Sequence, residues 1–221
     1  MLVRLRQEVQ ALPRRLTLVV LLVLALAGFV ALASSYDGSL GDVDTEVARG
    51  VASDLPGFLE AIARPFSWLG GWIGLTVLSI AAIAVLVHER SWLDLAFFVT
   101  AFLGSQLVAS LLKNGFDRPR PDAGSSVPLP DSSSFPSGHA TAGAASLGAV
   151  AVLLAERLPS PRARAWLWAA TVALGVVVGL SRIALGVHYL TDVLAGWCLG
   201  LAWLAACLLV REAILARTRS R

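Results

Sequence analysis

Six long apolar runs, separated by short polar segments, dominate the chain. The runs are Leu16–Ala33, Leu69–Val87, Trp92–Leu112, Ala140–Ala155, Trp166–Ser181 and Tyr189–Val210. An α-helix needs about 20 apolar residues to cross the hydrocarbon core of a bilayer, so each run predicts a transmembrane helix that takes in flanking residues where the run is short. The pattern predicts an all-α integral membrane protein, a bundle of six transmembrane helices that forms a single domain over residues 1–221.

The composition agrees with a membrane protein. Hydrophobic residues make up 57% of the chain and charged residues 15%, which excludes a typical soluble domain. Cys198 and Cys207 lie on different faces of the last predicted helix, so we expect no disulfide between them. Because the sequence has no CxxC motif and no cluster of His, Asp or Glu at metal-ligand spacing, it predicts neither a metal nor another cofactor.

The first apolar run has two interpretations. Arg14 and Arg15 precede it and Ala31-Leu32-Ala33 ends it, a pattern that also fits a signal peptide with an A-x-A cleavage site. The run is long for the apolar part of a signal peptide. We therefore expect a retained transmembrane helix.

Basic residues orient the predicted bundle. With the N-terminus inside and six spans, the cytoplasmic segments hold Arg4, Arg6, Arg14, Arg15, Arg90, Arg157, Arg162, Arg164, Arg211, Arg217, Arg219 and Arg221. The other side holds only Arg49, Arg64, Lys113, Arg118, Arg120 and Arg182. Because positive charge accumulates in cytoplasmic segments, this imbalance predicts a multi-pass protein of the cell membrane with both termini in the cytoplasm. The net charge of +3 is then a sign of topology, and we expect no nucleic-acid partner.

Two polar segments lie on the extracytoplasmic side in this topology. Residues 34–65 connect the first two helices, begin with an acidic stretch and contain a candidate interfacial helix near Val47–Ile62. The loop from about residue 113 to 138 is rich in Pro, Asp and Ser, which predicts an irregular, exposed backbone.

Lys113 and Arg120 form the first of three polar clusters beside the apolar runs. Lys113 is the only lysine of the chain, and Arg120 belongs to the step Arg118-Pro119-Arg120-Pro121. Proline stiffens this step, and Lys and Arg side chains bind phosphate. The alternative is a basic loop that binds lipid headgroups beside the membrane. The role of Arg118 stays open.

Pro136-Ser137-Gly138-His139, at the start of the fourth run, is the second cluster. The free N–H groups and the positive dipole end of a helix start bind anions, and Gly138 allows the backbone to approach a ligand. In the alternative interpretation, Ser137 only caps the helix and His139 is an interfacial side chain without chemistry.

Ser181-Arg182, with His188 and Asp192, is the third cluster. His188 and Asp192 are four residues apart at the start of the last helix, so they share one helix face. A carboxylate at that spacing can hold one imidazole nitrogen protonated and leave the other free as a base or nucleophile. The alternative is a polar helix end at the membrane interface.

All three clusters fall on one outward face of the predicted bundle. Lys113 ends the third helix, His139 begins the fourth, Arg182 ends the fifth and His188 begins the sixth. Fixed cations, two histidines and a carboxylate at one place predict a phosphate site with a nucleophile and an acid. His88 lies on the opposite side, where we expect a solvated loop residue.

The three clusters together resemble the complete signature of a known enzyme family. The motifs Lys113-x6-Arg120-Pro121, Pro136-Ser137-Gly138-His139 and Ser181-Arg182-x5-His188-x3-Asp192 resemble the three-part signature of the type-2 phosphatidic-acid phosphatases. Their superfamily also includes vanadium haloperoxidases and bacterial acid phosphatases. No residue of the signature is missing, whereas residues 34–65 carry no part of it.

The resemblance implies a role for each matching residue. His188 would attack phosphorus and form a phosphohistidine, Asp192 would orient His188, and His139 would protonate the leaving group. The phosphoryl oxygens would be bound by Lys113, Arg120, Arg182, Ser137 and the N–H of Gly138. These fixed cations and dipoles would do the work that a metal does in other enzymes, so we expect turnover without a metal ion.

The expected function is a lipid phosphatase whose partners are its lipid phosphate substrate and membrane lipids, with no obligate protein partner. Candidate substrates are phosphatidate, phosphatidylglycerol phosphate and undecaprenyl diphosphate, and a polyprenyl diphosphate is narrowly favoured. Two alternatives are a vanadate-dependent, haloperoxidase-like oxidoreductase and a non-catalytic binder or transporter of lipid phosphates. Six spans and a site at lipid level argue against the first, and the complete signature argues against the second.

Overall fold

The computed structural model describes residues 2–121, 125 and 127–219, without the side chains of residues 2–13, of Trp72 and of Arg219. Four arginines of the predicted charge pattern therefore lie outside the described side chains: Arg4, Arg6, Arg219 and Arg221. The regular secondary structure of the described residues is entirely helical. The helices are α1 (Leu2–Ser35), α2 (Gly41–Asp54), α3 (Gly57–Leu69), α4 (Trp72–His88), α5 (Trp92–Phe116), α6 (Gly138–Arg157), α7 (Pro161–Ala184) and α8 (Leu190–Arg219).

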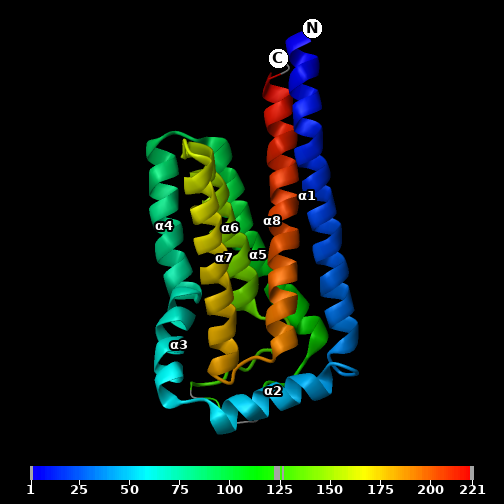
Figure 1. The fold of residues 1–221 in the computed structure, drawn as a ribbon, viewed down its shortest axis with the longest axis vertical. Coiled ribbons are helices and arrows are strands. Elements are labelled where there is room, and N and C mark those ends of the chain that lie inside the picture. The colour runs from blue at the N-terminus through cyan, green and yellow to red at the C-terminus, as the bar shows by residue number, and fades with distance from the viewer. Residues whose placement is uncertain (1, 122–124, 126, 220–221) are drawn as a thin grey trace.

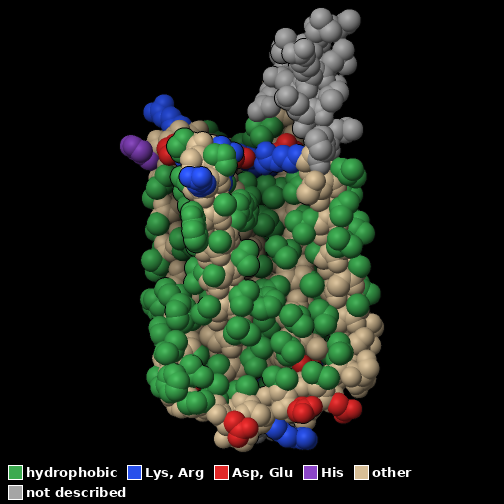
Figure 2. All heavy atoms as spheres, in the orientation of Figure 1, with side chains coloured by type: hydrophobic (Ala, Val, Ile, Leu, Met, Phe, Trp, Pro, Cys, Tyr) green, Lys and Arg blue, Asp and Glu red, His purple; other side chains and the backbone are tan. Residues whose placement is uncertain are grey.

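The helices form an upright bundle that α2 crosses at one end (Figure 1). At the opposite end α1 begins and α8 ends, so we call the two ends the α2 end and the terminal end. The segments long and apolar enough to span a membrane, within the described residues, are Arg14–Ser35, Gly57–His88, Trp92–Phe116, Gly138–Arg157, Pro161–Ala184 and Leu190–Thr218. Charged side chains gather at both ends of a broad apolar belt (Figure 2). The prediction of an all-α membrane bundle with six spans is confirmed.

Several helices extend beyond the apolar runs because polar residues cap them. The fourth run, Ala140–Ala155, lies within the longer α6. The Ser137 hydroxyl caps this helix by accepting the N–H of Ala140 at 3.5 Å. Ser160 caps α7 in the same way, and Pro161 occupies the first helical position, where its missing N–H is no loss.

The segment between the first two spans differs from the predicted single helix near Val47–Ile62. It forms two helices, α2 and α3, which separate at Leu55 and Pro56. Proline disfavours a helical conformation in the residue before it, and Leu55 is accordingly extended, with φ −71° and ψ 116°. As a result, α2 lies across the bundle, and α3 turns back and leads through Gly70 and Gly71 into α4 (Figure 1).

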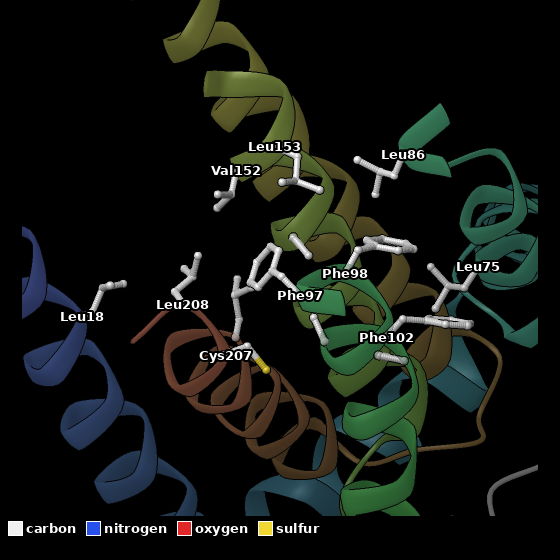
Figure 3. Close-up of a cluster of buried hydrophobic side chains, with 14 residues drawn as sticks. Leu18, Leu75, Leu86, Phe97, Phe98, Phe102, Val152, Leu153, Cys207 and Leu208 are labelled. Carbon is white, nitrogen blue, oxygen red and sulfur yellow. The ribbon is translucent and has the colours of Figure 1, made fainter. Parts of the chain in front are cut away.

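The core contains phenylalanine side chains of α5 that pack against aliphatic side chains of α6 and α8 (Figure 3). Phe98 is fully buried and stacks on Phe102, with ring centroids 6.3 Å apart. Val152 and Leu153 of α6 and Leu208 of α8 belong to the same cluster. In a membrane, close packing of this kind holds helices together, because lipid tails are as apolar as the side chains themselves.

A small residue on α8 lets this helix approach α6 closely near the α2 end. A Cβ atom at Gly196 would lie 2.7 Å from both the Ala140 Cβ and the Ser137 carbonyl oxygen, so the position needs glycine. The close approach brings the starts of the two helices together. The N–H of Ser137 donates to the carbonyl oxygen of Asp192 at 2.9 Å, which links the second and third polar clusters through the backbone.

Candidate active site

The three polar clusters meet at the α2 end of the bundle (Figure 1). Lys113 and Arg182 lie in the last turns of α5 and α7, and His139 and Asp192 lie in the first turns of α6 and α8. The structure therefore brings the predicted site residues to one end. His88 is exposed at the terminal end, on the side that the sequence predicts, but it is the last residue of α4 and not a loop residue.

His188 and Asp192 form a buried pair at the start of α8. The preceding turn requires Gly186, whose φ of 68° lies in the left-handed region. His188 Nδ1 lies 3.3 Å from Asp192 Oδ2, and the same oxygen accepts the backbone N–H of Tyr189 at 2.9 Å. The carboxylate thus favours the tautomer with a proton on Nδ1 and leaves Nε2 with a free lone pair.

Burial keeps His188 in its neutral form. Burial, together with the positive charges of Arg182 and Lys113, lowers the pKa of His188 to about 4 against the opposing effect of Asp192. At neutral pH the imidazole is then uncharged, the state that a nucleophile or a general base needs. Its Nε2 lies 3.4 Å from Arg120 Nη1, so the free lone pair faces a cation.

Arg120 is held beside His188 by main-chain oxygens. Its Nη1 donates to the Val187 carbonyl at 2.9 Å. Its Nε donates to the carbonyls of Pro130 and Ser132 at 3.0 and 3.2 Å. None of these partners carries a charge, so the positive charge of the guanidinium remains available to an anion.

Lys113 and Arg182 are also bonded to neutral groups, and with Arg120 we call them the site cations. Lys113 Nζ donates to the carbonyl of Ser133, and Arg182 Nη1 donates to the hydroxyl of Ser67 in α3. The Nε of Arg182 is buried without a hydrogen-bond partner in the described part of the chain. A buried donor without a partner is costly, so a phosphate oxygen at this nitrogen would remove that penalty and add an ion pair.

His139 lies between two cavities. It is half-buried in the first turn of α6 and borders one cavity of about 590 Å³ and another of about 340 Å³. Lys113 lines the larger cavity and Arg182 the smaller one. A Cβ atom at Gly71 would lie 3.0 Å from His139 Nε2, so glycine at that position leaves the imidazole room. The imidazole therefore stands between two of the site cations.

Ser137 and Gly138 start α6 in different ways. Ser137 is completely buried and its hydroxyl caps the helix, so the capping role is observed, and a contact of this hydroxyl with phosphate stays a prediction. Gly138 borders the larger cavity, where an added Cβ would meet the Lys113 Cε at 3.9 Å. Its backbone is open to a ligand at the positive end of the helix dipole.

Arg118, which has no predicted role, lies among the buried charges of the site. It forms ion pairs with Asp192 at 2.6 Å and with Asp44 at 2.7 Å. Burial alone would lower the pKa of Arg118, but the two carboxylates outweigh burial and raise it. Asp44 is buried, although it belongs to a segment that looks exposed in the sequence. The double Arg-Pro step is a signal for Arg118, whereas no sequence signal marks Asp44 or Ser67.

Metal ligands form no recognisable group in the part of the chain that the structure describes, since no three His, Cys, Asp or Glu side chains are arranged to hold an ion. The two buried carboxylates near the site, Asp44 and Asp192, are bonded to the guanidinium of Arg118 instead. Turnover without a metal stays a prediction.

Comparison with known sequences gives a family match and named relatives. A family model described as the PAP2 superfamily matches residues 94–215, which is more than half of the chain and includes all three polar clusters. Phosphatidylglycerophosphatase B of Bacillus subtilis (strain 168) is 33% identical over 58% of this chain, and the match spans 62% of that relative's length. The decaprenylphosphoryl-5-phosphoribose phosphatase of Mycobacterium tuberculosis (strain ATCC 25618 / H37Rv) is 38% identical over 72% of this chain and 85% of its own length.

Comparison with solved structures extends the similarity to the whole bundle. The crystal structure of a transmembrane PAP2 type phosphatidylglycerolphosphate phosphatase from Bacillus subtilis superposes with a TM-score of 0.81 and 27% sequence identity. The match covers 87% of this chain and 96% of the other. It therefore includes helices that lie before the region matched by the family model.

Proposed function

The protein belongs to the PAP2 superfamily, and we propose that it is a membrane lipid phosphatase that hydrolyses a lipid phosphate monoester or diphosphate through a phosphohistidine on His188. The observation that carries this proposal is the buried His188–Asp192 pair whose free imidazole nitrogen faces Arg120. The relatives named above support it, because both are phosphatases of lipid-linked phosphates by name.

In the first step, His188 Nε2 attacks phosphorus and the bond from phosphorus to the leaving oxygen breaks. His139 donates a proton to that oxygen, so the lipid leaves as an alcohol, or as a monophosphate when the substrate is a diphosphate. The phosphoryl oxygens carry negative charge through the transition state, and the site cations stabilise it. Asp192 stabilises the imidazolium that forms on His188, in the way that a triad carboxylate does.

In the second step, water attacks the phosphorus of the phosphohistidine. His139, now deprotonated, accepts a proton from the water as the nitrogen–phosphorus bond breaks. Inorganic phosphate leaves and His188 returns to its neutral form. The two steps together convert one lipid phosphate and one water into a dephosphorylated lipid and phosphate.

The larger cavity supports a lipid as the leaving group. Leu75 of α4 and Ala109 and Leu111 of α5 line it, together with Lys113. Leu111 is 61% exposed in a segment that is long and apolar enough to span a membrane, so this wall of the cavity reaches the surface that lipid covers. A lipid chain beside these side chains would have its phosphate next to Lys113. Phosphatidate, phosphatidylglycerol phosphate and undecaprenyl diphosphate are the candidates.

The position of the site supports catalysis on the outer side of the cell membrane. The site lies at the α2 end, and the chain begins and ends at the terminal end (Figure 1). The positive-inside rule assigns Arg90, Arg157 and Arg211 to the cytoplasm. Arg90 lies in the turn between α4 and α5 at the terminal end, and Arg157 and Arg211 lie toward the terminal ends of α6 and α8. With the termini in the cytoplasm, substrate would enter from the outer leaflet.

Phosphate release from a panel of lipids in detergent tests this function. The panel contains phosphatidate, phosphatidylglycerol phosphate and undecaprenyl diphosphate, each assayed with excess EDTA. We expect release from at least one lipid, no loss of rate with EDTA, and inhibition by vanadate, which mimics the phosphoryl group in the transition state.

Three other outcomes would contradict the proposal. A strict requirement for Mg²⁺ would contradict the charge stabilisation by the site cations. Halide oxidation in the presence of vanadate, without phosphate release, would favour the haloperoxidase-like alternative. Tight binding of a lipid phosphate without any release would favour a binder or transporter.

A further inference from the structure

Arg118 connects the start of α8 with α2 through one guanidinium. Its Nη1 donates to Asp192 Oδ1 at 2.6 Å and to Thr191 Oγ1 at 2.8 Å. Its Nη2 donates to Asp44 Oδ2 at 2.7 Å. The side chains of Arg118 and Asp44 are only 5% and 1% exposed, so solvent and salt screen these ion pairs weakly.

Two tyrosine rings hold the faces of this guanidinium. The Cζ atom of Arg118 lies 4.6 Å from the ring centre of Tyr36 and 4.3 Å from that of Tyr189. Tyr36 in turn stacks on the fully buried Phe135, with ring centroids 4.9 Å apart. A guanidinium that is held by rings on its faces and by carboxylates on its edges has one orientation, and it imposes that orientation on Asp192.

Asp192 divides its two oxygens between two partners. Oδ1 accepts from Arg118, whereas Oδ2 accepts from His188 and from the N–H of Tyr189. A cation on one oxygen also reduces the negative potential that the carboxylate exerts at its other partner. Without a second carboxylate, Arg118 would orient Asp192 toward His188 but would reduce the negative potential that stabilises an imidazolium on His188.

Asp44 supplies the negative charge that offsets Arg118. The Asp44–Arg118 pair is neutral overall, so Asp192 retains one net negative charge opposite His188. Asp44 Oδ1 also accepts the backbone N–H of Thr191 at 3.0 Å, which docks α2 on the first turn of α8. When His188 becomes an imidazolium, the four buried charges sum to zero.

We propose that Arg118 and Asp44 are positioning residues for the phosphohistidine step. Arg118 orients the carboxylate of Asp192 toward His188. Asp44 neutralises the charge of Arg118, so that the negative charge of Asp192 can stabilise the imidazolium. This inference rests on the proposed function of the site, and it assigns to α2 a part in the chemistry. The competing interpretation is a structural link between α2 and α8 that leaves the charge at His188 unaffected.

The other charged and titratable groups around His188 are the same in every variant used below. They are the site cations from α5, α7 and the connection after α5, His139 of α6, and Tyr189, which follows His188. A difference in pH dependence between the variants therefore reports the charge of Arg118 or of Asp44.

Asp44→Asn and Arg118→Met should shift the pH profile in opposite directions. Both should lower kcat about 10- to 100-fold with little change in KM, because each removes a hydrogen bond to a charged group. Loss of the Asp44 charge makes the surroundings of His188 more positive and lowers its pKa, so the acidic limb of kcat/KM moves to lower pH. Loss of the Arg118 charge moves that limb to higher pH. Arg118→Lys keeps the charge and should leave the limb in place.

Arg211 and Asp94 provide the matched controls. Arg211 is equally buried and pairs with Asp94 at 2.7 Å and with Glu156 at 2.8 Å. It lies toward the other end of α8, roughly 28 Å from Asp192 at the helical rise of about 1.5 Å per residue. Arg211→Met and Asp94→Asn should lower the melting temperature in detergent while kcat and the acidic limb match the wild type.

The proposal is overturned if the acidic limbs of kcat/KM move in the same direction in Asp44→Asn and Arg118→Met. It is also overturned if both acidic limbs stay in place while only the melting temperature falls. If Arg118→Met does not fold, the nearly isosteric Asp44→Asn decides by the direction of its shift. A wild-type protein that releases no phosphate from any lipid of the panel would contradict the proposed function instead, so the two failures are distinguishable.

Discussion

Two buried arginines, one toward each end of the bundle, show that similar ion pairs can serve different purposes. Arg211 donates to Asp94 and Glu156 with all three of its side-chain nitrogen atoms. Glu156 also pairs with Arg14, and within the described chain neither carboxylate contacts a site residue. Arg118 is paired with two carboxylates as well, but one of them, Asp192, also holds the imidazole of His188. The ion pairs of Arg211 only join helices. Those of Arg118 join α2 to α8 and also contact the carboxylate that holds the reactive imidazole.

The three site cations also differ from two arginines of the terminal end. At the terminal end, Arg14 and Arg157 pair with glutamate side chains. At the α2 end, the site cations bond to hydroxyl and carbonyl groups. Cations with carboxylate partners hold the fold together, whereas cations with neutral partners maintain the positive potential that attracts a phosphate. The site cations thus differ from Arg14 and Arg157 in their bonding partners.

The largest loss of activity is expected at His188. His188→Ala removes the nucleophile, and turnover should be abolished on every substrate, because the covalent step has no other route. Phosphate release from lipid and aryl phosphates under one set of conditions measures this. Turnover of any of these substrates by the variant would mean that another group attacks phosphorus.

Asp192→Asn should lower kcat about 10⁴-fold, by analogy with loss of the orienting carboxylate in a serine protease triad. Asparagine has the same shape but presents the wrong hydrogen-bonding group to His188. The control is Asp94→Asn, which changes the ion-paired carboxylate of the terminal end and should leave kcat near the wild-type value. Equal losses in the two variants would remove the distinction between the ends.

His139→Ala should lower the rate on lipid substrates by about 10²- to 10⁴-fold, the usual contribution of a general acid. The loss should be much smaller for an aryl phosphate, whose leaving group needs little protonation. Rates for a series of leaving groups of increasing basicity measure the effect. The same loss for every leaving group would exclude His139 as the acid.

Arg182→Gln should lower kcat/KM about 10²- to 10³-fold, as does loss of one stabilising donor at other oxyanion sites. Arg157→Gln, which removes an arginine paired with Glu89 at the terminal end, is the comparison and should be close to wild type. Assays of both variants on the same lipid test whether a cation with a neutral partner is the one that binds phosphate. A similar loss in Arg157→Gln would contradict this.

The smallest effect on rate is expected for Arg211→Met. This variant removes the buried cation that pairs with Asp94 and Glu156, while Glu156 keeps Arg14 as a partner. The loss should cost about 1–3 kcal/mol of folding free energy, because both carboxylates keep some contact with solvent. Thermal unfolding in detergent would show the loss as a lower melting temperature, while kcat of the folded protein stays unchanged. A fall in kcat at unchanged stability would show that the terminal end takes part in turnover.

The spans and the polar clusters could be predicted because both are local in the sequence. An apolar run of sufficient length predicts a membrane helix by itself. His188 and Asp192 are one helical turn apart, so their contact follows from the helix geometry. The prediction of a single helix near Val47–Ile62 is wrong, because Pro56 disfavours a helical conformation at Leu55 and interrupts the surrounding helical pattern.

The Arg118–Asp44 pair could not be predicted, because its two residues are 74 positions apart and meet only when α2 docks across the bundle. The same holds for Arg182 and Ser67, which are 115 positions apart. In the sequence, Asp44 is one of several acidic residues in a polar segment, and nothing distinguishes it from its exposed neighbours Asp42 and Glu46. Contacts of this kind depend on tertiary packing and have no periodic or spacing signal.

The most direct test of the central claim is the detection of a phosphoryl group on His188. The protein is mixed with a substrate that carries radiolabelled phosphate, quenched in alkali during turnover, and separated from free phosphate. The account predicts a protein-bound label that is stable to base and labile to acid in the wild type and in Asp94→Asn, and no such label in His188→Ala. A wild type that turns over without any such label, or a label that persists in His188→Ala, would contradict it.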